Sequence, residues 1–191
     1  TFWLRLRIPK DTPADIYRAE AVLRTKNGDK EHECRFPLVI RVLPFELPPV
    51  TTHFFGEYYR LTGKMSPEET RAAIDRDLAD MRDHGMTSVG LCFGIDETKV
   101  TLNGTEVTGL GFDGTTPFEH LMEAYLRNGF TMPIILLADS GQHVAQKAGA
   151  YPSPEYDAAY KSFWTAVQKT CHERNWPEII VQPVDEPSWQ G

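Results

Sequence analysis

From about residue 50 onward, the sequence repeats one order of elements: a helix start, an amphipathic helix and a short apolar segment. Ser66 and Thr116 are each followed by a proline and, three positions later, by Glu69 and Glu119. This spacing is the capping box, which marks the first turn of a helix. Ser153, which also precedes a proline, marks a third helix start.

Each predicted helix ends near a glycine or asparagine and runs into a short apolar strand. Together with an aromatic stretch before the first helix, the predicted strands cover 52–59, 87–93, 132–138 and 178–184. Apolar strands separated by amphipathic helices are typical of a buried parallel sheet. We therefore expect an α/β fold in which these are strands 1–4, the first half of a (β/α)8 TIM barrel. An open doubly wound sheet also fits, although no glycine-rich phosphate-binding motif follows any predicted strand.

The N-terminal quarter of the chain instead alternates apolar and polar residues, as half-buried strands do. Asn27 followed by Gly28 predicts a hairpin turn, because both residues tolerate positive φ. The turn would join a strand over 17–25 to one over 33–43, with a further strand over 2–8. We interpret these as the last strands of a β-sandwich domain.

A proline-containing segment, 44–49, separates the two patterns. Proline stiffens the backbone and cannot donate to a strand ladder, so this segment predicts a linker. We expect residues 1–48 to be the C-terminal part of the sandwich with its linker, and residues 49–191 to be the N-terminal half of a catalytic barrel. Because the sequence opens inside a strand pattern, we expect it to be an excerpt of a longer protein.

Two adjacent carboxylates, Asp185 and Glu186, follow the last predicted strand, which Pro187 terminates. The long predicted loops, 94–115 and 139–152, also follow strands, as in barrel enzymes, which build their active sites on that side. Glycosidic cleavage needs a proton donor and a negative charge near the anomeric carbon. Neighbouring carboxylates can divide these roles, because one charge raises the pKa of the other. The pair predicts a glycoside hydrolase with Glu186 as proton donor.

Four stretches carry a family resemblance: residues 8–17, 66–69, 77–87 and 175–187. Together they resemble glycoside hydrolase family 123 and its uncharacterised relatives, which join a β-sandwich to a (β/α)8 barrel. The resemblance implies a β-N-acetylhexosaminidase that acts on β-linked N-acetylgalactosamine. It also implies a secreted or periplasmic protein.

The mechanism that the resemblance implies is retaining and substrate-assisted. The 2-acetamido oxygen of the substrate attacks the anomeric carbon and forms an oxazolinium intermediate. Glu186 would be the general acid and base, and Asp185 would hold and charge-stabilise the acetamido group. Adjacent acids suit this chemistry, because the substrate replaces the second carboxylate that other retaining enzymes use as nucleophile.

Two alternatives remain open. Asp185-Glu186-Pro187 also resembles the Asn-Glu-Pro of a large clan of retaining barrel enzymes, in which Glu186 would be the acid/base and the nucleophile would lie outside this chain. The aspartate disfavours this alternative, because a carboxylate cannot donate to a sugar hydroxyl as an amide does. The second alternative is a non-catalytic carbohydrate-binding barrel.

Other side chains are expected to contact the sugar from the carboxyl ends of the strands. Trp189 could stack on a sugar face, Tyr58 and Tyr59 end the first predicted strand, and Asp139 directly follows the third. Weaker candidates lie in the two long loops: Asp96, Glu97 and His143.

Composition narrows the partners to an oligosaccharide or glycoconjugate. The net charge of −7, without a cluster of basic residues, disfavours nucleic acid. No apolar run approaches the roughly 20 residues of a membrane span. The histidines lack metal-site spacing and no cofactor motif is present, so we expect neither a metal nor a cofactor. Cys34, Cys92 and Cys171 fit small buried residues, with a disulfide left open. The sequence does not indicate an oligomeric state.

Overall fold

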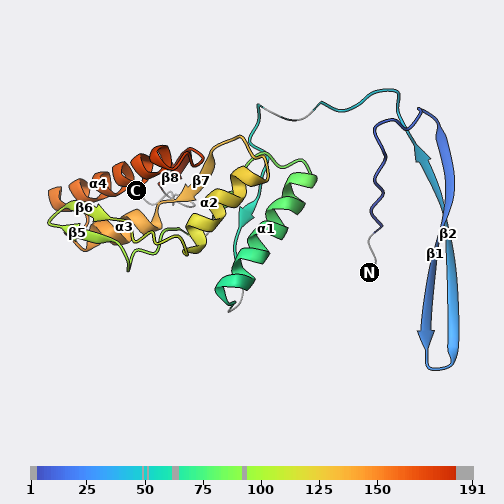
Figure 1. The fold of residues 1–191 in the computed structure, drawn as a ribbon, viewed down its shortest axis with the longest axis horizontal. Helices are drawn as coiled ribbons and strands as arrows, with labels where there is room; N and C mark the ends of the chain where they lie inside the picture. The colour runs from blue at the N-terminus through green and yellow to red at the C-terminus, as the bar shows by residue number, and fades with distance from the viewer. Residues whose placement is uncertain (1–3, 49, 51, 62–64, 92–93, 184–191) are drawn as a thin grey trace. The chain divides into compact units, whose positions relative to one another are not determined.

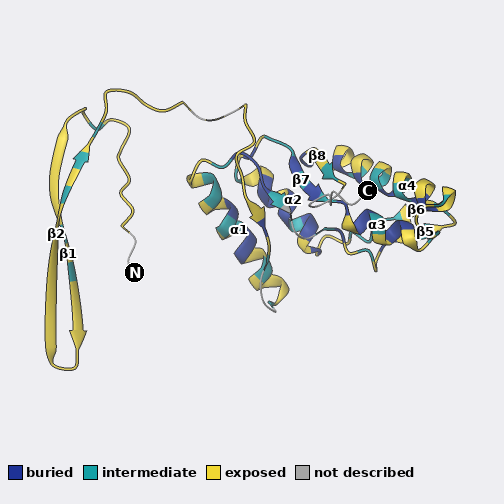
Figure 2. Ribbon diagram, turned by 180° about the vertical axis from the view of Figure 1, so that it is seen from behind, coloured by how far each residue is buried: buried dark blue, intermediate teal, exposed yellow. Residues whose placement is uncertain are grey.

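The computed structural model describes residues 4–48, 50, 52–61, 65–91 and 94–183. The chain divides into two compact units, Thr1–Pro49 and Val50–Gly191, and the division falls at the end of the proline-containing segment 44–49. Figure 2 shows that the first unit is exposed along nearly its whole length, whereas buried residues concentrate in the second.

The first unit is a single antiparallel hairpin of β1 (Ile16–Asn27) and β2 (Lys30–Arg41) (Figure 1). Gly28 has a φ of 63°, in the left-handed region that this tight turn requires, so the predicted turn is confirmed. Ion pairs cover one face, with Arg24 2.8 Å from Glu33. The other face carries the apolar side chains: Tyr17, Ala19, Ala21, Leu23, Cys34, Phe36, Leu38 and Ile40.

The predicted β-sandwich does not form in this unit. Within its described part, no second sheet packs on the hairpin, and residues 4–8 form no strand. Cys34 is therefore exposed rather than buried. Alternation of apolar and polar residues specifies which side chains share a face of a strand, but it does not specify what covers that face.

The second unit is built on a four-stranded parallel sheet in the order β3-β4-β7-β8. Its strands are β3 (Tyr58–Tyr59), β4 (Gly90–Leu91), β7 (Ile134–Leu137) and β8 (Ile179–Gln182). The connecting helices are α1 (Pro67–Asp83), α2 (Pro117–Arg127), α3 (Asp139–Gln146) and α4 (Pro154–Glu173). A small antiparallel pair, β5 (Thr101–Asn103) and β6 (Glu106–Gly109), lies between β4 and α2.

Within the described residues, helices cover only one face of this sheet. Tyr59, Ile134 and Ile179 belong to one core with apolar residues of α1, α2 and α4. The alternate residues point the other way, and Tyr58 and Ile180 are 55% and 41% exposed. This follows from the strand order: right-handed crossovers between strands taken in sequence place every crossover helix on the same side.

The described strands do not form a barrel, so the prediction of a half TIM barrel is wrong. They form an open sheet with β3 and β8 as its edges. The order of strands never reverses, so the sheet is not doubly wound either. Repeated strand and helix patterns specify parallel neighbours, whereas barrel closure depends on strand number, tilt and stagger, which those patterns do not encode.

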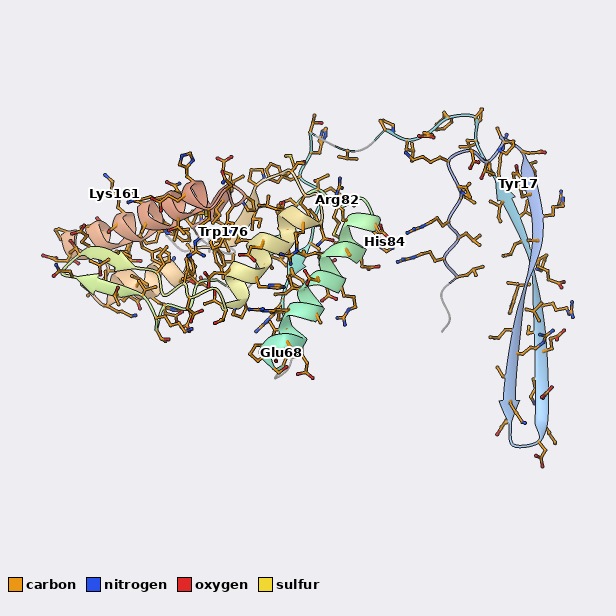
Figure 3. The ribbon with its side chains drawn as sticks, in the orientation of Figure 1. Tyr17, Glu68, Arg82, His84, Lys161 and Trp176 are labelled. Carbon is orange, nitrogen blue, oxygen red and sulfur yellow. The ribbon has the colours of Figure 1, made fainter. Side chains whose placement is uncertain are left out.

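Local signals placed the helix starts correctly. Ser66 and Thr116 complete the predicted capping boxes, and the Ser153 side chain accepts a hydrogen bond from the Tyr156 amide at 3.1 Å. Figure 3 shows Glu68 and Arg82 at opposite ends of α1, where each charge complements the helix dipole. Among the described helices, none is long and apolar enough to cross a membrane.

Two elements differ from the sequence prediction. The first strand of the sheet covers only Tyr58 and Tyr59, because the residues before it bond to Thr87 instead. The hydroxyl of Thr87 accepts from the Phe55 amide at 2.9 Å and donates to the His53 carbonyl at 2.6 Å. The predicted loop over 139–152 contains α3, which sequence inspection missed.

A buried carboxylate, that of Glu119 in α2, joins the loop before this helix to the distant end of α4. The side chain is 1% exposed. Its Oε2 accepts from the amides of Asp113 and Gly114 at 3.1 and 2.9 Å, and from the Thr116 hydroxyl at 2.9 Å. Its Oε1 accepts from Arg174, just after α4, at 2.6 Å. Both carboxylate oxygens are therefore satisfied away from water.

Aromatic rings hold Arg174 in place beside this carboxylate. Its guanidinium carbon lies 4.8 Å from the centre of the Trp176 ring and 5.5 Å from that of Phe112. Burial by itself raises the pKa of Glu119, but the hydrogen bonds from Arg174 and Thr116 outweigh it and lower the pKa below its ordinary value. Glu119 is therefore ionised at neutral pH and fixes the position of the loop before α2.

We expect Glu119→Gln to lower the free energy of unfolding by about 3 kcal/mol, because it leaves Arg174 and several amides without their charged partner. Chemical denaturation measures this loss. Glu123→Gln, in the exposed ion pair with Arg127 on the same helix, is the matched control and should cost no more than about 0.5 kcal/mol. Equal effects of the two changes would contradict the proposed role of Glu119.

The stability should also depend on pH through Glu119. Its pKa in the folded state lies below the ordinary value of 4.5, so its stabilising contribution is complete above that pH. The contribution is lost as the pH falls through the lower folded pKa. Denaturation series below pH 5 should show a smaller decline for Glu119→Gln than for the wild type, and parallel declines would contradict the assignment.

Candidate functional site

Polar side chains gather where the strands of the parallel sheet end. Asp96 and Glu97 follow β4, and Asp139 follows β7. In open α/β sheets, ligands bind in the crevice beyond the carboxyl ends of the strands. This edge of the second unit is therefore the candidate site.

A pocket of about 460 Å³ lies at this edge and is named here the α3 pocket. Pockets of about 300–1,000 Å³ are typical for small ligands. Its apolar wall includes Leu61, Ile95 and Phe118. The polar groups on its lining come from the β4 loop and from α3: Asp96, Glu97, Asp139, Ser140 and His143. The weaker sequence candidates and Asp139 thus line one cavity.

The β4 loop presents its two carboxylates in different ways. Asp96 accepts hydrogen bonds from the hydroxyl and amide of Thr98 at 2.6 and 3.0 Å. The Thr98 hydroxyl is the main cause that lowers the pKa of Asp96, so this group is ionised and fixed in orientation. Glu97 Oε1 lies 3.5 Å from Nδ1 of His143, and Lys147 donates to the Glu97 carbonyl oxygen. Glu97 and His143 therefore join the two walls of the pocket.

Ser140 is a buried hydroxyl residue on the pocket lining. It is 7% exposed, and within the described part of the chain no hydrogen bond of its hydroxyl is found. A Cβ placed on Gly94 would lie 2.3 Å from Ser140 Oγ, so the two walls approach each other closely here. The Ser140 hydroxyl therefore remains available to water or a ligand in the pocket.

Asp139 stands in the first turn of α3. Its side chain is exposed on the pocket lining, and no described residue forms a hydrogen bond or ion pair with it. Ala138, at the N-cap, provides no side-chain hydrogen bond to the helix. The carboxylate of Asp139 therefore complements the positive end of α3 and also has acceptor sites open to the pocket.

The end of β8 is joined directly to α3. The Ala138 amide donates to the Gln182 carbonyl at 3.1 Å, and the Gln142 side chain donates to the Pro183 carbonyl at 3.2 Å. On its other side α3 packs closely on α4, since a Cβ on Gly141 would lie 2.6 Å from Nε1 of Trp164. Tight packing on both sides makes α3 a rigid wall of the pocket.

The predicted sugar-binding tyrosines lie on opposite faces of the sheet. Tyr59 is 4% exposed, and its hydroxyl donates to Asp77 of α1 at 3.2 Å, so it belongs to the core and does not reach the site. Tyr58 lies on the uncovered face. Its hydroxyl donates to Gln182 Oε1 at 3.2 Å, which links the two edge strands across the sheet.

The remaining predicted site residues, Asp185, Glu186 and Trp189, lie outside the described residues. Sequence reasoning missed Ser140 and the pairing of Glu97 with His143. The spacing of Asp139, Ser140 and His143 spans one helical turn and would have indicated a helix. Across the described ranges, no group of three or more side chains is arranged to hold a metal ion.

Comparisons with protein families, curated proteins and solved structures yield no match for this chain. The resemblance to glycoside hydrolase family 123 therefore rests on the quoted residues alone.

The close approach of Gly94 to Ser140 makes a double-mutant test possible. Gly94→Ala should destabilise the protein by about 1–3 kcal/mol, because the added methyl group overlaps the Ser140 hydroxyl. In a Ser140→Ala background the same change should cost less than about 1 kcal/mol, since the nearest remaining side-chain atom is the Cβ at 3.4 Å. Thermal denaturation of the four proteins measures the coupling. Additive effects would contradict this geometry.

Proposed function

We propose that the protein carrying this sequence is a glycoside hydrolase that cleaves β-linked N-acetylhexosamine, with N-acetylgalactosamine as the preferred sugar. The reaction is retaining and substrate-assisted, and Glu186 and Asp185 perform it. The observation that carries the proposal is the direct hydrogen bonding of α3 to the end of β8. This strand precedes the acid pair, and α3 forms one wall of a polar pocket.

The chemistry of the α3 pocket supports a carbohydrate ligand. Sugar rings present hydroxyl groups that both donate and accept, together with apolar C–H faces. The pocket offers carboxylate acceptors in Asp139 and Glu97, a hydroxyl in Ser140 and an apolar wall that includes Leu61 and Phe118. Pockets that combine an apolar lining with a few polar groups are typical of small-molecule sites.

In the proposed first step, the acetamido oxygen of the substrate attacks the anomeric carbon while Glu186 gives its proton to the leaving glycosidic oxygen. Asp185 accepts a hydrogen bond from the acetamido N–H and stabilises the positive charge of the oxazolinium. In the second step, the Glu186 carboxylate takes a proton from water, which attacks the anomeric carbon and restores the acetamido group. The configuration at that carbon is retained because it is inverted twice.

Glu186→Gln should reduce kcat/KM on an aryl β-N-acetylgalactosaminide by about 100-fold or more, because the amide cannot give up a proton to the leaving oxygen. Glu178→Gln is the matched control. Glu178 is an exposed carboxylate just before β8, at the opposite end of the same strand, and its loss should leave the rate unchanged.

Absence of turnover by the wild type on aryl β-linked N-acetylgalactosaminides and N-acetylglucosaminides would exclude the proposed function. Turnover of plain galactosides or glucosides would favour a two-carboxylate mechanism with Glu186 as acid/base.

A thiazoline that mimics the oxazolinium should inhibit the enzyme far more strongly than N-acetylgalactosamine itself, since transition-state and intermediate analogues bind about 100-fold tighter or more. Asp185→Asn should weaken this inhibition, because the charge that stabilises the oxazolinium is removed. Inhibition no stronger than that by the free sugar would contradict the substrate-assisted step.

A further inference from the structure

We propose that the α3 pocket is a sugar subsite that accepts a neutral ring and rejects a ring bearing a carboxylate or sulfate. This inference rests on the proposed function and deepens it. The preferred substrate would carry a neutral sugar next to the N-acetylhexosamine that is cleaved, so acidic glycans rich in uronic acids or sulfate esters would be poor substrates.

The unpaired hydroxyl of Ser140, a largely buried residue on the described pocket lining, is the first observation that points to a ligand. This residue is 7% exposed, lines the pocket, and forms no hydrogen bond within the described part of the chain. Gly94 leaves room for the hydroxyl where any larger residue would collide with it. Ligand hydroxyls can satisfy such a group, which can both donate and accept.

The charge of the lining decides which ring fits. Asp96, Glu97 and Asp139 contribute three carboxylates, and Asp139 occupies the positive end of α3 that would otherwise attract an anion. The described lining holds no lysine or arginine, and its His143 faces Glu97. Of the lysines near the β4 loop, Lys99 pairs with Asp113, and Lys147 donates to the Glu97 carbonyl oxygen. An anionic ligand in this pocket would meet three carboxylates, and no lysine or arginine of the described lining would offset the repulsion.

The carboxylates still suit a neutral sugar. Asp139 has open acceptor sites, and both hydrogen bonds from Thr98 go to Oδ1 of Asp96, so its Oδ2 remains an acceptor for a ligand within the described part of the chain. Sugar hydroxyls donate well to ionised carboxylates, because charge-assisted hydrogen bonds are stronger than neutral ones. Leu61 and Phe118 provide an apolar wall for the C–H face of the ring.

The test measures binding, not hydrolysis, by titration calorimetry or ligand-observed NMR at low salt and pH 7. The probes are methyl β-galactoside and methyl β-galacturonide, which differ only in the carboxylate at C6. We expect the neutral glycoside to bind at least about tenfold more tightly than the uronide, because the uronide adds a like charge. Asp139→Asn should reduce the ratio of the two dissociation constants several-fold, because it removes one of the repelling charges. Ser140→Ala should weaken binding of the neutral probe about threefold to tenfold, because it removes a hydrogen-bonding hydroxyl.

The matched control is Asp157→Asn, which changes an exposed acid in the first turn of α4. It should change neither the ratio of the two dissociation constants nor the affinity for the neutral probe. Thermal denaturation of each variant confirms that it is folded. Equal or tighter binding of the uronide would overturn the proposal, as would binding of the neutral probe that neither Asp139→Asn nor Ser140→Ala alters.

The two proposals fail in distinguishable ways. If the wild type hydrolyses no N-acetylhexosaminide but binds the probes as expected, the hydrolase function falls and the neutral-sugar subsite stands as a binding site. If hydrolysis depends on Glu186 while the probes bind without charge discrimination, the subsite assignment falls and the proposed function stands.

Discussion

The Glu119 carboxylate is the point at which segments far apart in the second unit meet. It accepts from the loop before α2, completes the cap of that helix and pairs with Arg174 beyond α4. A carboxylate that is 1% exposed is tolerated only because each oxygen has a donor. These bonds fix the end of the connection between β4 and α2, where Thr116 and Phe118 line the α3 pocket, so the position of one pocket wall depends on this interaction.

The second constraint on the architecture is that the described helices cover only one face of the four-stranded sheet. Strands taken in sequence with right-handed crossovers put α1, α2 and α4 on a single face. Parallel sheets are generally covered on both faces, and here Tyr58 and Ile180 remain exposed on the other. The hydrogen bond from Tyr58 to Gln182 connects the two edges across this uncovered face and ends at the last residue of β8.

The short helix α3 connects the sheet to the candidate site. Its beginning is hydrogen-bonded to the end of β8, its glycine packs on Trp164 of α4, and its first turns carry Asp139, Ser140 and His143. These residues face Glu97 from the β4 loop. A pocket with one wall from each of two adjacent strand ends is a consequence of parallel pairing, which brings those ends to the same edge.

The sequence by itself determined the local elements, because their signals involve neighbours along the chain. The capping boxes at Ser66 and Thr116 and the turn at Gly28 lie where the residues predict them. It also identified Asp139 as a residue at a strand end. Tertiary structure alone decided that the sheet is open, that Tyr59 is buried while Tyr58 is exposed, and that Ser140 has no partner in the described chain. These outcomes depend on pairing and packing between distant segments, which no local pattern encodes.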